Sequence, residues 1–321
     1  MSILIKSAKI IDASSKFNGK TKDIFINQGI IQEISDSIVK KSDKEINYDN
    51  LHVSQGWLDT SVCFGEPGLE ERETIENGSL TACLSGFTDI ILNSNTLPVI
   101  DSKADIIYVL SKNKNKALKI HPLGALTLKS EGSEMAELRE MFDSGAVGFY
   151  DYKMSVKNPN LLKTALQYVQ HFKGLIMTFP FEKSICEDGQ MNEGEISTLY
   201  GLEGIPSLSE EIILERDLKI LEYTGGKLFI PTISTSKSVE LIKNAKQKGL
   251  KVMTSVSINN LFFNEKKLIN FDTRFKVLPP IRSEEERLIL VNALSEGIID
   301  FCTSDHCPID IDNKKTDFKN S

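Results

Sequence analysis

Two carboxylates, one imidazole and one thiol are the side chains of this sequence best placed to do chemistry. Asp151 and Asp305 each end an apolar run, and His306 follows Asp305 directly. Cys63 ends an earlier run. A carboxylate accepts a proton as a general base or binds a metal ion, whereas a thiol becomes a nucleophile only when a base or a lowered pKa activates it. The sequence has four histidines: His52, His121, His171 and His306. Imidazole ligands are scarce at the ends of the apolar runs, because only His306 lies at such an end.

Each of these groups also has a structural interpretation. The two carboxylates are either remnant metal ligands or partners of nearby loops and backbone amides. Cys63 is either a reactive thiol or a small buried hydrophobe, as free cysteines commonly are. We expect His306 to orient its own loop in preference to binding a metal ion, and Asn95 either to contact a small ligand or to cap a loop. The other side chains at the ends of the apolar runs are polar or aromatic: Ser61, Asn93, Phe179, Phe181, Thr232, Ser257 and Asn259.

Eight short apolar runs follow one another from residue 57 onward, with helix-like segments between them. Near-continuous apolar strands that alternate with helices are typical of a parallel sheet buried on both faces. The count of eight favours an α/β fold of the (β/α)8 TIM-like barrel type over a doubly wound open sheet. In such barrels the active site lies at the carboxyl ends of the strands. The runs are 57–64, 87–92, 117–126, 146–152, 174–181, 227–234, 251–258 and 298–305.

The segments between the runs carry signals for the start of a helix. One is an Asn-Pro pair, which supplies an N-cap and a first helical residue. Two have the Ser-x-x-Glu spacing of a capping box. The three are Asn158-Pro159, Ser207 to Glu210 and Ser283 to Glu286.

Residues 2–53 have the short alternating runs typical of β-strands. Asn27-Gln28-Gly29 separates two of them and predicts a tight hairpin turn. We therefore expect a small β-sandwich domain over 1–53 and the barrel over 54–321. After Asp305 the sequence continues for only sixteen residues. We expect the helix that covers strand eight to be missing, so either the chain is truncated or a partner covers that seam.

The composition is that of an ordinary globular protein: 321 residues, 40% apolar, 26% charged, with a net charge of −7. Basic residues are spread among acidic ones, so we expect no nucleic-acid partner. No uncharged apolar run reaches about 18 residues and the first residues alternate, so we expect no membrane span and no signal peptide. Five scattered cysteines without a Cys-x-x-Cys pair predict a cytoplasmic protein.

Motifs in a fixed order run along nearly the whole chain. Residues 58–68 read Leu-Asp-Thr-Ser-Val-Cys-Phe-Gly-Glu-Pro-Gly, and residues 303–308 read Thr-Ser-Asp-His-Cys-Pro. They resemble two dihydroorotase motifs, Asp-x-His-x-His-Phe-Arg-Glu-Pro-Gly on strand one and Thr-Asp-His-Ala-Pro on strand eight. The resemblance implies an amidohydrolase barrel, as in allantoinases and hydantoinases, and a β domain whose C-terminal strands are missing here. Other matching segments are 95–98, 145–151, 192–194, 204–217, 233–235 and 279–282.

The departures from the family's pattern fall on its metal ligands. The resemblance places the family's four histidine ligands at Ser61, Cys63, Phe179 and Thr232. It keeps both carboxylate ligands, Asp151 and Asp305, and the substrate-binding Asn95.

Three other substrate-shell residues of the family are replaced in this sequence. They fall at Gly65, Leu278 and Ile309.

This pattern implies that the family's catalytic zinc is lost. Such a zinc is held by about three protein ligands beside an open water position. Zinc lowers the pKa of its bound water to about 7, so without zinc Asp305 would be a vestigial general base facing water that hardly ionises. We expect no tightly bound zinc and no other cofactor.

The resemblance leaves three functions open. The first is a non-catalytic dihydroorotase-like protein of pyrimidine biosynthesis, since some such chains assemble with aspartate transcarbamoylase; a homo-oligomer is the other expected assembly. The second is an active cyclic amide hydrolase, which converts dihydroorotate and water to carbamoyl aspartate with an unusual zinc site. The third is a module that binds a small ureide in the old pocket.

Overall fold

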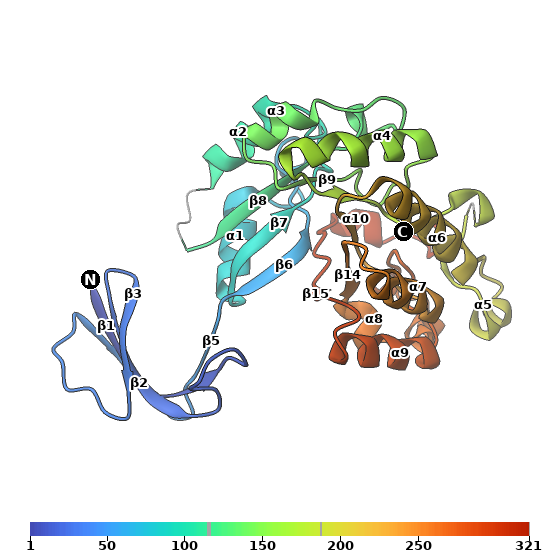
Figure 1. Ribbon diagram of the computed structural model, residues 1–321. Coiled ribbons are helices and arrows are strands. Elements are labelled where there is room, and N and C mark those ends of the chain that lie inside the picture. The colour runs from blue at the N-terminus through green and yellow to red at the C-terminus, as the bar shows by residue number, and fades with distance from the viewer. Residues whose placement is uncertain (114–116, 187, 321) are drawn as a thin grey trace. The chain divides into compact units, whose positions relative to one another are not determined.

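The computed structural model describes residues 1–113, 117–186 and 188–320. The chain divides into two compact units, Met1–Trp57 and Leu58–Ser321. The second unit carries the barrel strands and their helices (Figure 1).

The first unit is a β-sheet built around one long strand, β1. β2 pairs antiparallel with β1, and β4 and β5 both pair parallel with it. Because β1 is long enough to carry β4 near its start and β5 near its end, the described strands hydrogen-bond as one sheet, not the two sheets of the expected sandwich. The strands are β1 (Ser2–Ile11), β2 (Thr21–Asn27), β3 (Ile30–Ser35), β4 (Lys44–Ile46) and β5 (His52–Ser54).

The predicted hairpin turn is confirmed between β2 and β3. Gln28 and Gly29 have φ angles of 52° and 77°, as a two-residue turn of this kind requires. Beside the hairpin, the buried carboxylate of Asp23 accepts hydrogen bonds from Lys6 Nζ at 2.7 Å and from the Ile38 amide at 2.9 Å. This carboxylate therefore ties β1 to the segment after β3.

The second unit contains the predicted barrel. Among the described residues, its strands form an eight-stranded sheet in chain order, so each strand lies beside the next. A parallel bridge between Val62 and His306 joins the first strand to the segment after the last and closes the ring. The strands are β6 (Trp57–Val62), β7 (Phe87–Leu92), β8 (Lys119–Gly124), β9 (Gly148–Phe149), β10 (Ile176–Met177), β13 (Leu228–Ile230), β14 (Val252–Ser257) and β15 (Phe301–Thr303). Each falls inside one predicted run.

Helices follow the barrel strands and cover them from outside (Figure 1). The helices that cover the sheet are α1 (Ile75–Leu84), α2 (Lys103–Lys112), α3 (Leu138–Asp143), α4 (Pro159–Val169), α6 (Ser207–Thr224), α7 (Ser236–Gln247) and α9 (Glu284–Ser295). Shorter elements lie in the loops at the carboxyl ends of the strands: β11 (Met191–Asn192), β12 (Gly204–Ile205), α5 (Glu195–Tyr200), α8 (Ile258–Phe262) and α10 (Ile311–Lys314).

Two of the three predicted helix starts are confirmed. Asn158 caps α4, and the Ser283 hydroxyl accepts the Glu286 amide at the start of α9. The capping box at Ser207 is wrong, because Pro206 is the N-cap of α6 and makes no side-chain cap bond. The Glu210 side chain turns instead to the loop before α7, where it accepts the Ser234 amide at 2.9 Å.

The apolar core around the barrel sheet has two layers, one on each face of the sheet. The outer layer packs strands against helices. The inner layer fills the barrel with large side chains, namely Leu123, Tyr150, Met177, Phe179 and Phe229. Much of the barrel interior is therefore aromatic.

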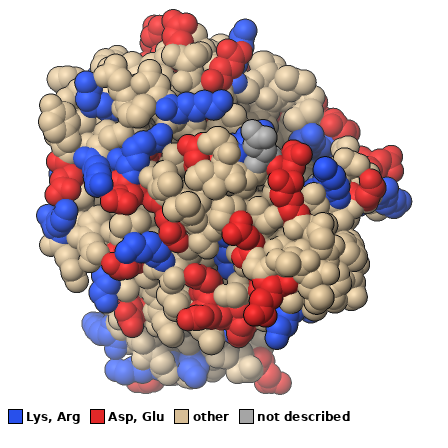
Figure 2. All heavy atoms as spheres, turned by 90° about the vertical axis from the view of Figure 1, so that its right-hand side faces the viewer, with Lys and Arg blue, Asp and Glu red and all other residues tan. Residues whose placement is uncertain are grey.

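The surface is charged and mixed in sign. Lys and Arg side chains lie among Asp and Glu side chains on the face that Figure 2 shows. Each helix in the described part of the chain is too short or too polar to span a membrane.

Candidate functional site at the barrel mouth

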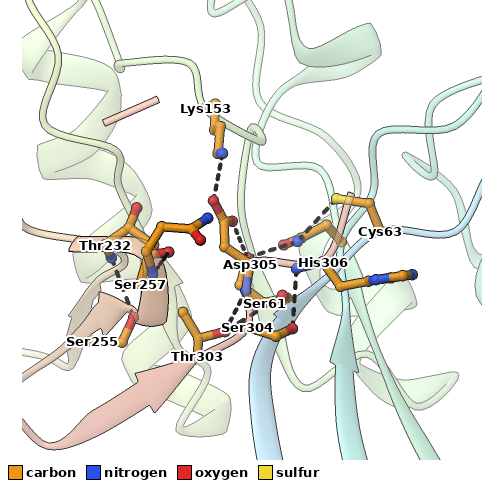
Figure 3. A network of polar contacts seen from close by, with 12 residues as sticks. Ser61, Cys63, Lys153, Thr232, Ser255, Ser257, Thr303, Ser304, Asp305 and His306 are labelled. Carbon is orange, nitrogen blue, oxygen red and sulfur yellow. Dashed lines mark hydrogen bonds and ion pairs between the residues drawn. The ribbon is translucent and has the colours of Figure 1, made fainter. Parts of the chain in front are cut away.

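Asp305 lies at the barrel mouth, two residues after β15. Its backbone adopts the left-handed region, with a φ of 53°, and its carboxylate is 7% exposed. The Lys153 ammonium, from the loop after β9, lies 2.7 Å from Asp305 Oδ2, and Ser61 Oγ donates to Oδ1 at 3.2 Å (Figure 3). Both carboxylate oxygens therefore already have partners on this chain.

Lys153 is one residue of this site that the sequence analysis did not predict. It comes four residues after β9, on a polar loop with no periodicity. The available signal was its place two residues beyond Asp151, at a strand end that the barrel must turn toward the mouth.

Ser61 and Cys63 lie where the family's strand-one histidines would be, and both contact Asn93. Asn93 Nδ2 donates to Ser61 Oγ at 3.2 Å and to Cys63 Sγ at 3.4 Å. Cys63 is 3% exposed, and burial raises the pKa of its thiol well above the ordinary value. A thiol that keeps its proton matches the structural interpretation of Cys63.

Cys307 is a second thiol at the mouth. Its hydrogen bond with Cys63 lowers the pKa of Cys307 to about 6, against the opposing effect of burial, and the charge of Lys153 acts in the same lowering direction. The family motif has alanine at this position, so the resemblance gave Cys307 no role.

Asp151 stands between two residues of the inner core, Tyr150 and Tyr152, and its carboxylate holds the loop after β8. Its carboxylate accepts the amides of Leu126 and Thr127 at 2.9 and 3.0 Å, and the Thr127 hydroxyl at 2.6 Å. Burial raises the pKa of Asp151. These bonds correspond to the structural interpretation of Asp151. The neighbouring Tyr152, not Asp151, packs against the inner core.

The other two replaced ligand positions carry no metal donor of the family's kind. Phe179 is 2% exposed, belongs to the inner core and lies against Phe181, with 6.0 Å between ring centroids. Thr232 has a left-handed φ of 50°, and its amide donates to Ser255 Oγ at 3.2 Å. An apolar ring therefore fills the position that the resemblance assigns to the strand-five imidazole.

The donors present do not fit the zinc centre that the resemblance implies. In the described ranges, no three His, Cys, Asp or Glu side chains gather where they could hold one ion. Catalytic zinc needs about three such ligands. Asp305, Cys63 and Cys307 lie at the mouth, but they do not form such a group, and Asp305 is paired with Lys153.

His306 and Asp59 fasten the closing seam of the barrel. His306 Nε2 lies 2.6 Å from Glu73 Oε2, and this hydrogen bond raises the pKa of His306. Asp59 accepts the Thr303 hydroxyl and the Ser304 amide, which join β6 to β15. His306 thus has the orienting role expected for it.

A buried polar network explains several other motif residues. The Glu210 carboxylate accepts Ser234 N at 2.9 Å and Ser238 Oγ at 2.6 Å. The buried Arg282 guanidinium donates to Ser234 Oγ at 3.1 Å and to Asn192 Oδ1 at 2.9 Å. Segments that matched the family at 192–194, 204–217, 233–235 and 279–282 therefore meet in one scaffold beside the mouth.

Comparisons with known proteins agree with this geometry. The model of the family described as dihydro-orotase-like matches residues 52–238. The chain is 34% identical over 320 residues to a dihydroorotase of Ruminiclostridium cellulolyticum, covering 99% of this chain and 74% of that protein. It is 35% identical over 317 residues to a dihydroorotase of Acetivibrio thermocellus, covering 98% and 74%.

Solved structures show the same fold. The L-hydantoinase of Arthrobacter aurescens superposes with a TM-score of 0.84 at 21% sequence identity, covering 99% of this chain and 72% of that one. A D-hydantoinase superposes with a TM-score of 0.79 at 20% identity, covering 100% and 73%. The likeness to these structures concerns the fold alone, whereas the sequence matches concern the family. The chain belongs to the dihydroorotase-like family of amidohydrolases.

Proposed function

We propose that this chain is a non-catalytic, dihydroorotase-like protein of pyrimidine biosynthesis. The observation that carries the proposal is the ion pair between Lys153 Nζ and Asp305 Oδ2 at 2.7 Å. In the family pattern this carboxylate binds metal and accepts a proton, and here its counter-ion is an ammonium of the same chain. An ammonium in this place does not lower the pKa of a water molecule to about 7, as a bound zinc ion does, so the carboxylate would have to act on ordinary water.

Three further features support the same conclusion. Phe179 replaces an imidazole with an apolar ring, and Thr232 and Ser61 offer neutral hydroxyls. The donor set falls short of the about three ligands that catalytic zinc requires. The family's carboxylate-binding Arg falls at Gly65, so a charge-assisted contact worth about 1.5–3 kcal/mol is also missing.

A hydrolysis assay tests the proposal. Purified full chain, with and without added zinc, is incubated with dihydroorotate, and carbamoyl aspartate is quantified. We expect no turnover above the buffer rate. Turnover that depends on zinc and disappears in Asp305→Asn would show an active hydrolase. A companion variant carries Ser61→His, Cys63→His, Phe179→His and Thr232→His, and we expect it to gain zinc binding.

The finer part of the proposal concerns assembly with aspartate transcarbamoylase. It rests on the pathway to which the dihydroorotase relatives belong. It also rests on the resemblance to members of the family that lack similar metal ligands. The test is co-purification of the two proteins, followed by the activity of the transcarbamoylase with this chain present or absent. A complex with altered activity supports the role, and no complex with unchanged activity rejects it.

A second candidate function is binding of a small ureide at the mouth. Among the described residues, the side-chain oxygens Asn93 Oδ1, Asn95 Oδ1 and Thr232 Oγ1 are buried without a hydrogen-bond partner. Buried orphan oxygens are costly and accept N–H donors readily. Thermal unfolding with carbamoyl aspartate or dihydroorotate tests this, because a ligand at about 100 times its Kd stabilises the fold by about 2.7 kcal/mol.

A further inference from the structure

Cys63 and Cys307 lie opposite each other where the barrel closes. The parallel bridge pairs Val62 with His306, and the Cys63 amide donates to the His306 carbonyl at 2.7 Å. Cys63 and Cys307 are the next residue on each side of that bridge, so they are neighbours across the seam. Adjacent strands lie about 4.8 Å apart, inside the range of about 4.4–6.8 Å between Cα atoms that a disulfide spans.

The two side chains also point the same way. Val62 packs into the outer core beneath the helices, so Cys63, the next residue along the strand, faces the inside of the barrel. There the Cys63 thiol contacts Asn93 and hydrogen-bonds the Cys307 thiol. The two sulfur atoms are therefore direct neighbours in the reduced protein, in which both cysteines are free.

The two thiols differ in access. Cys63 is buried, whereas Cys307 is partly exposed. An oxidant arriving from solvent meets Cys307 first, and the sulfur next to it is a shielded thiol. A reachable cysteine beside a resolving cysteine is the arrangement from which oxidation proceeds to a disulfide.

We propose that Cys63 and Cys307 form a modification site, a dithiol that a hydroperoxide converts reversibly into a disulfide across the barrel seam. The Cys307 sulfur attacks the peroxide and becomes a sulfenic acid, and the peroxide is reduced to an alcohol, or to water in the case of hydrogen peroxide. The Cys63 sulfur then attacks the sulfenic sulfur, the S–S bond forms, and one water leaves. Two thiols are oxidised by two electrons and one peroxide is reduced.

A disulfide at this seam is expected to change the stability of the fold. The contacts across the ring closure include one β-bridge, the Asp59 contacts, the Ser61–Asp305 bond and the His306–Glu73 pair. They hold β6 and the loop after it to β15 and the segment after β15. A disulfide there links positions 244 residues apart and constrains the unfolded chain strongly. We expect the oxidised protein to unfold at a higher urea concentration than the reduced protein. This inference is independent of the proposed function.

The experiment treats the reduced full chain with a few equivalents of hydrogen peroxide. Free thiols are counted after denaturation, and peptides are mapped by mass spectrometry before and after dithiothreitol. We expect the count to fall from five to three, because the chain has five cysteines. The mapped link is expected to join the peptides of Cys63 and Cys307, and dithiothreitol is expected to restore the count.

Variants separate this site from the other cysteines. Cys63→Ser and Cys307→Ser should each abolish the link, whereas Cys302→Ser, which changes an exposed cysteine on β15, should leave it intact. A link between other cysteines, or irreversible oxidation of Cys307 while Cys63 stays free, would overturn the proposal. The wild-type map decides the question even if a variant fails to fold.

Discussion

Lys153 and Asp305 stand 152 residues apart in the sequence and meet as an ion pair at the barrel mouth. The ammonium is 19% exposed and the carboxylate 7%, so the pair is largely removed from water. A cation from the chain itself thus faces the carboxylate that the resemblance assigns to the family's metal. Lys153 therefore provides the charge that balances Asp305 in this chain.

Removing the cation should destabilise the fold. Lys153→Met leaves the Asp305 carboxylate buried without its counter-ion, and we expect a loss of about 1–3 kcal/mol in the free energy of unfolding. Urea denaturation measures it. The double variant Lys153→Met with Asp305→Asn should recover most of the loss, because no buried charge remains. Lys157→Met, on the exposed end of the same loop, is the matched control and should change little. A loss equal to that of the control would mean that the pair contributes nothing.

Asp151 should act as a structural residue, whether or not metal is present. Asp151→Asn weakens the charge-assisted bonds to the Leu126 and Thr127 amides, and we expect a cost of about 1.5–3 kcal/mol. The cost should be the same in chelator and in added zinc. Glu134→Gln, an exposed carboxylate near the same loop, is the control. A zinc-dependent difference between Asp151→Asn and the wild type would contradict this role.

Glu210 and Glu211 give a contrasting pair of neighbours. Glu210→Gln should cost about 2–4 kcal/mol, because its carboxylate accepts several buried donors beside the buried Arg282. Burial and the charge of Glu210 raise the pKa of Glu211. Its ionised form is therefore disfavoured, and Glu211→Gln should be neutral or stabilising. Thermal unfolding of both variants at pH 7 checks the opposite signs, and equal losses would refute the assignment.

The His306–Glu73 pair should make stability depend on pH. The pKa of His306 is raised in the folded chain by its bond to Glu73. Its contribution is therefore fully present below the unfolded pKa of about 6.5 and is lost as pH rises through the folded pKa. Because the ring is 37% exposed, we expect at most about 1 kcal/mol.

Urea denaturation at pH 6 and pH 9 measures the effect of this pair. The wild type should exceed Glu73→Gln in stability by more at pH 6 than at pH 9. The exposed Glu71→Gln variant should show no such difference. A gap that widens toward pH 9 would contradict the sign.

The barrel could be predicted from the sequence because its strands are buried on both faces and therefore appear as uninterrupted apolar runs. The hairpin turn was equally local, since Gln28 and Gly29 alone satisfy it. The strands β11 and β12 could not be predicted, because each has two residues and depends on the loop around it.

Contacts between polar residues that are far apart in the sequence could not be predicted. Glu210 has the spacing of a capping box, yet contacts with Ser234 and Ser238 outweigh the local cap. The ion pair of Lys153 could not be predicted locally, because its partner Asp305 lies 152 residues away in the sequence. The sequence also could not predict which way the Asp151 side chain points. The preceding strand has only two residues, so the alternation of side chains along it is too short to assign Asp151 to one face of the sheet.

The central claim is that the mouth lacks the donors for a catalytic zinc centre. The most direct measurement is the zinc content of the full chain, purified without chelator, incubated with excess zinc and freed of unbound metal by gel filtration. We predict far less than one zinc per chain, with the same value in Asp305→Ala. One or more zinc ions per chain, lost in Asp305→Ala, would contradict the account.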